Sequence, residues 1–174
     1  LESTKYKKSV EAAHLDNKSA RTTLPGYNVI MWGKAKVLEI AAEMNPFESE
    51  YFVWVDAGLS RFWWPAKGDA ATNVRWPSND PEVLKNAFGG GVNGDRITIT
   101  MQSGHKWKDT ATQACTLPYS GLFVGIPGIA GGIIGGTKKA IRRFRGLQEK
   151  FVDDMLATGV TATDEQIRPA MNCV

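Results

Sequence analysis

The stretch YFVWVDAG, residues 51–58, decides the fold of this chain. Residues 51–55 are consecutive aromatic or β-branched residues, a run typical of a strand buried on both faces in a parallel or mixed sheet. Asp56 follows directly, at the carboxyl end of the strand, where open α/β sheets bind ligands. Asp56 is therefore either a carboxylate for a divalent cation or a ribose hydroxyl, or a turn residue ahead of Gly58.

The segment before this strand predicts mainly helices. Residues 3–19 are polar and predict a surface helix, and residues 24–27 have the composition of a turn. Residues 31–44 predict a helix that ends at Asn45-Pro46. Its apolar positions at helical spacing are Met31, Ala35, Leu38, Ala41 and Ala42, supplemented by Val37 and Ile40.

The segment after the strand predicts one helix and several short strands. Asp80 is expected to cap a helix that has Pro81 at its first position and stops at residues 89–91. Residues 96–101 alternate polar and apolar side chains, which predicts a half-buried strand. Residues 119–126 and 129–134 predict short strands or extended segments.

The C-terminal part predicts two helices. Thr137 is expected to cap a long helix that ends at Gly159, and Thr163 a short one that meets Pro169. The core side of the long helix is predicted to be Ile141, Phe144, Phe151 and Met155, flanked by Leu147 and Val152. Because no repeat or linker divides the chain, residues 1–174 are expected to form a single α/β domain.

Composition places the chain in the globular class. Its 174 residues are 43% hydrophobic and 22% charged, and no apolar run reaches the roughly 18 residues of a membrane span. The chain begins at Leu1 without the pattern of a signal peptide, so we expect a processed product or part of something longer.

The net charge of +3 is concentrated in residues 138–150, where six basic residues accompany Glu149. The preferred interpretation is a solvated helix face, with an anion site for a group such as a diphosphate as the alternative. We do not predict a nucleic-acid partner, because such binders spread positive charge along a face or groove.

Several kinds of site are not predicted. Cys115 and Cys173 form no CxxC motif, and His14 and His105 lack metal-ligand spacing. The chain also has no GxSxG motif, so a hydrolase with a nucleophile triad is not expected.

Three further features have two interpretations each. The glycines in residues 131–136 either let the backbone approach a ligand or allow tight packing between strand and helix. Trp63 and Trp64 either stack on sugar rings or fill a small core under a loop. Residues 163–166 form a capping box that also fixes two carboxylates, Asp164 and Glu165.

These features together resemble the HtrL/YibB-type family. The resemblance rests on YNVIMWGK at residues 27–34, NPFESEYFVWVDAG at 45–58, AGGIIGG at 130–136 and DEQ at 164–166. It implies a GT-A-like domain with a central mixed sheet flanked by helices. It also implies a hexosyltransferase-type glycosyltransferase that moves a sugar from a nucleoside-diphosphate sugar to a glycan or other hydroxyl acceptor.

The resemblance also implies roles for individual residues. Asp56 falls where GT-A enzymes carry the DxD motif that holds Mn²⁺ or Mg²⁺, although Gly58 replaces the second aspartate. Lys34 and Arg61 would contact the diphosphate. The remaining implied roles are Gly131 and Gly132 against the donor sugar or acceptor, Trp63 and Trp64 at the acceptor, and Asp164 or Glu165 as the base.

The missing second aspartate leaves an alternative, a noncatalytic carbohydrate- or nucleotide-binding module of the same fold. The length adds a further expectation. GT-A domains usually begin with a strand–helix nucleotide-binding unit, whereas here the first strong strand already ends at the DxD-like position. We therefore expect either a minimal version of the fold or one that lacks part of the base-binding half, with weak nucleotide affinity.

Overall fold

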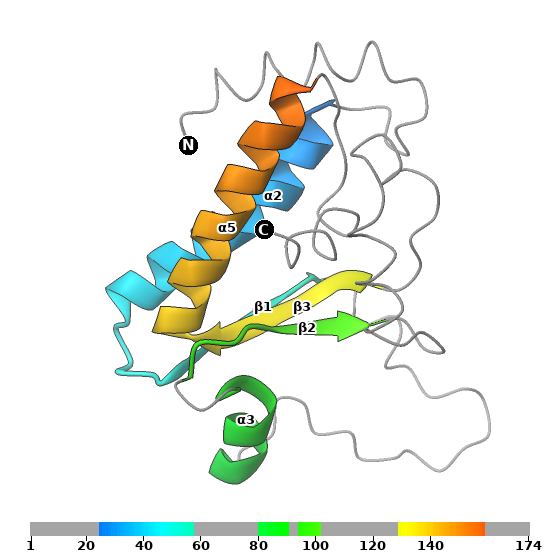
Figure 1. Ribbon diagram of the computed structural model, residues 1–174. Helices are drawn as coiled ribbons and strands as arrows, with labels where there is room; N and C mark the ends of the chain where they lie inside the picture. The colour runs from blue at the N-terminus through cyan, green and yellow to red at the C-terminus, as the bar shows by residue number, and fades with distance from the viewer. Residues whose placement is uncertain (1–24, 58–79, 91–93, 102–128, 159–174) are drawn as a thin grey trace, which may run out of the picture.

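The computed structural model describes residues 25–57, 80–90, 94–101 and 129–158 (Figure 1). These residues combine helices with a small sheet, which confirms a fold of mixed α and β structure. In chain order the elements are α2 (Pro25–Met44), β1 (Tyr51–Val55), α3 (Pro81–Phe88), β2 (Thr98–Met101), β3 (Ile129–Thr137) and α5 (Lys138–Ala157). The predictions for residues 3–19, 119–126 and 163–169 lie outside the described residues.

The described sheet is antiparallel, and the prediction of a mixed sheet is wrong for this part of the chain. Its strand order is β1-β3-β2, and β3 pairs antiparallel with both neighbours. Gly135 of β3 lies opposite Val53 on one side and Thr98 on the other. Helices lie on both faces of the sheet (Figure 1), but β1 is an edge strand of the described part and its residues are only half-buried, with Val55 exposed, so the predicted burial on both faces is wrong there.

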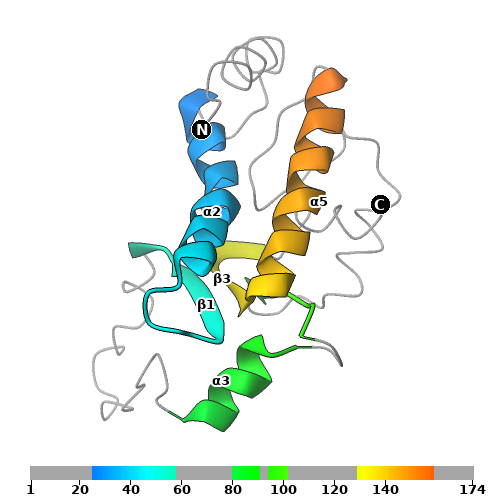
Figure 2. The ribbon, with the colours of Figure 1, turned by 90° about the vertical axis from the view of Figure 1, so that its left-hand side faces the viewer.

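The two long helices, α2 and α5, lie side by side over one face of the sheet (Figure 1, Figure 2). Phe52, Trp54 and Ile99 pack against the core that these helices form with Ile134, which is fully buried. Helix α3 lies on the opposite face, where Phe88 is 2% exposed and packs over β3. Successive side chains of β1 therefore point to opposite faces of the sheet, one covered by α2 and α5 and the other by α3.

The core side of α5 is the one that the sequence predicts. The buried set includes all four expected residues and Val152, while Leu147 is partly buried against the cluster. In α2, Ala35, Leu38 and Ala42 are buried as expected. Ala41, Val37 and Ile40 are exposed instead, so the apolar residues of α2 occupy more of its circumference than the core covers.

Local capping chemistry explains where the helices begin. The Asp80 carboxylate accepts a hydrogen bond from the Glu82 backbone N–H, and Pro81 follows as the first helical residue. The Thr137 hydroxyl accepts one from the Ala140 N–H at the start of α5. Both predicted caps are confirmed.

Three predicted boundaries differ from the structure. Helix α2 begins at Pro25, where a turn was expected, because the fixed φ of proline also suits a first helical position. Strand β2 begins at Thr98, later than predicted, and β3 runs on to Thr137. A fourth boundary, the end of α5, lies where it was predicted: the helix stops at Ala157 with Thr158 as its C-cap, directly before Gly159, which lies outside the described residues.

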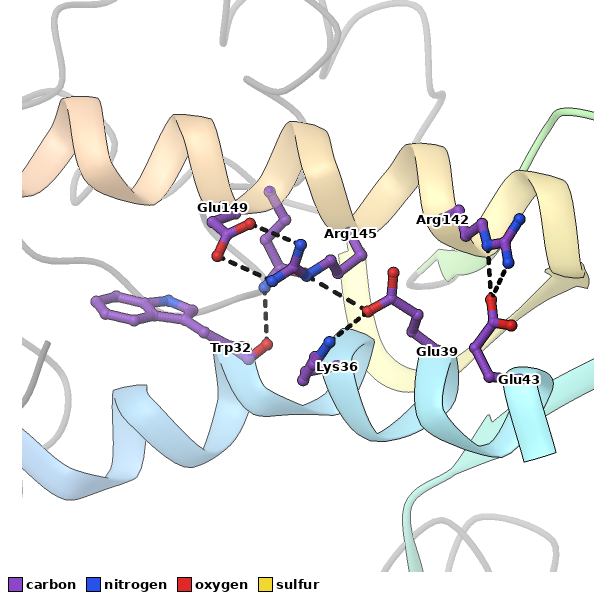
Figure 3. Close-up of polar contacts among 8 residues, drawn as sticks. Trp32, Lys36, Glu39, Glu43, Arg142, Arg145 and Glu149 are labelled. Atoms are coloured by element: carbon purple, nitrogen blue, oxygen red, sulfur yellow. Dashed lines mark hydrogen bonds and ion pairs between the residues drawn. The ribbon is translucent and has the colours of Figure 1, made fainter. Parts of the chain in front are cut away.

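Ion pairs join α2 to the basic stretch of α5 (Figure 3). Glu43 pairs with Lys138 at 2.8 Å and with Arg142, and Glu39 pairs with Arg145 at 3.6 Å. On the same helix, Arg145 also pairs with Glu149 at 2.8 Å. Most of the positive charge of α5 is thus paired: Lys138, Arg142, Arg145 and Lys150 contact carboxylates of α2 or of α5 itself, and Arg143 contacts Asp95.

Helix α2 has 20 residues and few charges, yet none of the described helices is long and apolar enough to span a membrane.

Candidate functional site

The candidate site is centred on the end of β1, where Asp56 meets Lys34 of α2. Lys34 Nζ lies 2.9 Å from Asp56 Oδ2. The lysine side chain is only 3% exposed, whereas the aspartate side chain is 33% exposed. The ammonium is therefore enclosed by the protein, and the carboxylate forms the part of the pair that solvent reaches.

Two further hydrogen bonds hold Asp56 in place. The indole Nε1–H of Trp54 donates to Asp56 Oδ1 at 2.5 Å, and the Asp56 backbone N–H donates to the Gly132 carbonyl at 2.9 Å. Trp54 and Asp56 are two residues apart in an extended segment, so their side chains lie on the same face. The carboxylate is consequently held by groups of α2 and β1, and the Asp56 backbone is held by β3.

The cost of an enclosed charge explains why this cluster is tightly joined. An ammonium removed from water is stable only when it is paired and hydrogen-bonded. Breaking a buried pair by removing one partner typically costs about 3–5 kcal/mol. The value here belongs at or below the low end of that range, because solvent screens the one-third exposed Asp56.

Asp56 does not fit the metal-binding role that the resemblance implies. Each carboxylate oxygen already accepts a hydrogen bond, and one of the donors is a cation that would repel a divalent ion at close range. Within the described ranges, no group of three or more His, Cys, Asp or Glu side chains is arranged to hold a metal. In the described part of the chain, Asp56 is thus a fixed carboxylate whose two oxygens both accept hydrogen bonds.

The glycine segment lies inside β3 and not in a loop. Gly135 and Gly136 match the packing interpretation: a Cβ on Gly135 would lie 2.7 Å from the Phe88 ring, and one on Gly136 would lie 3.1 Å from Ala140 Cβ. The earlier half of the segment reaches the candidate site, because the Gly132 carbonyl accepts from the Asp56 N–H. Gly131 is the neighbouring residue of β3.

The structure thus brings together Lys34, Asp56 and Gly132 among the predicted site residues. The others, Arg61, Trp63, Trp64, Asp164 and Glu165, lie outside the described residues.

Sequence reasoning missed two residues: Trp54, whose indole holds Asp56, and the buried Asn28. The spacing of Trp54 and Asp56 could have indicated their contact, since an indole N–H in a buried strand needs an acceptor. Asn28 is 1% exposed on the inner side of α2, and the apolar residues around it in the sequence concealed its burial. Buried polar side chains of this kind are informative because burial is costly for them.

No protein-family model matches this chain, and comparisons with curated proteins and with solved structures also find no match. The family resemblance therefore rests on the four sequence blocks quoted above.

Proposed function

We propose that this chain is a glycosyltransferase domain of the GT-A type that uses a nucleoside-diphosphate sugar. The family resemblance of the sequence supports this proposal. The structural observation that carries it is the contact of Lys34, Asp56 and Gly132, because the resemblance assigns all three to the donor site. Residues from distant parts of the sequence thus meet at the end of β1.

In this proposal Asp56 binds a hydroxyl group of the donor and does not hold a metal ion. Its carboxylate is one-third exposed, and each oxygen retains a lone pair beyond the hydrogen bond that it already accepts. Lys34 and Trp54 orient the carboxylate towards a hydroxyl donor. A ribose or sugar hydroxyl is the ligand group that fits such an acceptor.

The transfer step follows from ordinary glycosyl chemistry. The acceptor hydroxyl oxygen forms a bond to the anomeric carbon, and the bond from that carbon to the diphosphate oxygen breaks. The leaving nucleoside diphosphate takes the electron pair, and the carboxylate of Asp164 or Glu165 takes the hydroxyl proton. Arg61 is the proposed cation for the charge that develops on the diphosphate.

The proposal is tested by titrating the protein calorimetrically with UDP- and GDP-sugars, with and without Mn²⁺, and by mass spectrometry of the products. Binding that needs no Mn²⁺ is expected for the donor. Asp56→Asn should weaken that binding at least tenfold, whereas Asp153→Asn, on the exposed side of α5, should leave it unchanged. Donor binding that is equal in the wild type and the Asp56→Asn variant would contradict the proposal.

A second candidate function is a noncatalytic nucleotide- or carbohydrate-binding module. The observation that favours it is that Lys34 and Trp54 already engage both oxygens of Asp56. The same titration separates the two functions, because a binding module gives donor binding that depends on Asp56 without any transfer product.

A further inference from the structure

Exposed apolar side chains recur along one side of α2. Ile30 is 68% exposed, Val37 49%, Ile40 47% and Met44 72%. Apolar patches of several hundred Å² on a protein surface are usually interaction sites, and singly exposed side chains are not. These four side chains lie on one side of the helix, because they are three, four or seven residues apart.

The line has the repeat of a coiled-coil seam. Its residues alternate at intervals of four and three along the helix, and Phe47, 87% exposed, continues the pattern just beyond the helix end. This alternation places apolar residues every 3.5 positions, as at the a and d positions of a heptad. We call this set the outer strip, and its members are Gly26, Ile30, Gly33, Val37, Ile40 and Met44.

The outer strip is open to an approaching helix. A Cβ placed on Gly26 or Gly33 would find nothing within 4 Å, so both glycines leave room on the surface. Helix backbones pack closely where small residues alternate with large ones, because the large side chains of one helix fill the spaces of the other.

We propose that the outer strip pairs with the outer strip of a second copy of this chain, with the two helices antiparallel. Antiparallel pairing about residue 35 places Gly26 opposite Met44, Gly33 opposite Val37, and Ile30 opposite Ile40 of the other copy. Each glycine therefore meets a large side chain, and the surface is complementary to itself as a twofold interface requires. Parallel pairing would place glycine against glycine and leave gaps in two of the layers.

The charges of α2 do not oppose this pairing. The strip itself contains no charged residue. Lys36, which flanks it, forms an ion pair with Glu39 at 2.7 Å, and Glu43 is paired with α5. Lys34 is turned inward to Asp56.

The size of the strip indicates a weak dimer. A helix of 20 residues is about 30 Å long, and its strip offers less than the ~800 Å² per partner of a standard stable interface. We therefore expect association at micromolar or higher concentrations.

The test is sedimentation equilibrium of the full chain from about 1 to 200 µM, the range in which a small interface is half-associated. The wild type should shift from one chain to two across this range. Ile40→Glu should weaken the association at least tenfold. The matched control is Val83→Glu on α3, which is also 47% exposed but lies outside the strip, and it should associate like the wild type.

A double variant tests the orientation. In the antiparallel pair, Ile30→Glu combined with Ile40→Lys places opposite charges against each other, and association should recover relative to Ile40→Glu alone. In a parallel pair the same variant places like charges together and association stays lost, which would overturn the antiparallel arrangement.

Other outcomes would overturn the proposal as a whole. These are a wild type that stays monomeric at every concentration, or a dimer that Ile40→Glu leaves intact. A monomer whose Tm falls by several degrees in Ile40→Glu would show that another segment of the same chain covers the strip.

Discussion

The ammonium of Lys34 and the carboxylate of Asp56, 22 positions apart in the sequence, are 2.9 Å apart in the structure. The pair joins α2 to the end of β1, and it is asymmetric because the lysine is enclosed while the aspartate reaches solvent. An enclosed cation and an accessible carboxylate have different consequences when each is removed. The pair therefore permits an experiment that separates stability from ligand binding.

Removing one member of the pair should destabilise the protein more than removing both. Asp56→Asn removes a carboxylate that pairs with an enclosed ammonium, and we expect a loss of about 2–3 kcal/mol in the free energy of unfolding. Lys34→Met combined with Asp56→Asn should lose about 1 kcal/mol or less, since the double variant removes both charges of this pair. Urea denaturation of the single and double variants measures the difference.

The control for this experiment is Lys36→Met on the same helix. Lys36 is 44% exposed and pairs with Glu39, so its loss should change the stability by less than ~1 kcal/mol. If the double variant is as unstable as Asp56→Asn, then the pairing of charge is not what holds α2 against the end of β1.

The hydrogen bond from the Trp54 indole to Asp56 should contribute modestly to stability and strongly to donor binding. Trp54→Phe keeps an aromatic ring in the core and removes the N–H donor, at an expected cost of about 1–2 kcal/mol. Because the carboxylate loses one of the groups that orient it, calorimetric titration should show donor binding weakened by several-fold. Trp32→Phe, another partly buried tryptophan beside the core, should leave donor binding unchanged.

The sequence predicts the local elements of this fold better than their arrangement. The caps at Asp80 and Thr137 and the core side of α5 follow from chemistry within a few residues of each site. The antiparallel pairing of β3 with β1 and β2 depends on contacts between residues far apart in the chain. An apolar run such as residues 51–55 favours a strand, but it shows neither which strand pairs with it nor how deeply it is buried, and here it is a half-buried edge strand.

For the candidate site, too, the sequence predicts local features better than contacts between distant residues. The position of Asp56 at the end of a strand is visible in the sequence, whereas its contact with Lys34 follows from how α2 packs across the sheet. Helix α2 is the clearest example, because apolar residues occupy both its buried and its exposed sides. Periodicity identified the helix but could not decide which of these sides faces the core.

The ion pairs of Glu43 should make stability depend on pH. The hydrogen bond from Lys138, followed by the contact with Arg142, lowers the pKa of Glu43 below its ordinary value. A carboxylate with a lowered pKa in the folded state stabilises the protein above its unfolded pKa, and that contribution is lost as the pH falls through the folded pKa. The stability difference between wild type and Glu43→Gln should therefore shrink when the pH is lowered from 7 towards 3.

Urea denaturation at several pH values measures this difference. The variant with Lys138→Met and Arg142→Met together should show the same shrinkage, because it removes the same interactions from the other side. A difference that stays constant over this pH range would show that Glu43 acts through packing and not through its charge.

Gly135 should be among the glycines least tolerant of substitution in the described part of the chain. A Cβ at this position would lie 2.7 Å from two carbons of the Phe88 ring and 3.0 Å from Val53 Cγ2, so α3 would have to move away from the sheet. We expect Gly135→Ala to destabilise the protein by about 1–3 kcal/mol.

Gly146→Ala is the matched control, because Gly146 lies in α5 with nothing within 4 Å of a Cβ. That control should be neutral or more stable by up to about 1 kcal/mol, since alanine favours a helix more than glycine does. Combining Gly135→Ala with Phe88→Leu should recover part of the loss, and equal stabilities for the two glycine variants would show that α3 does not pack against β3 at this point.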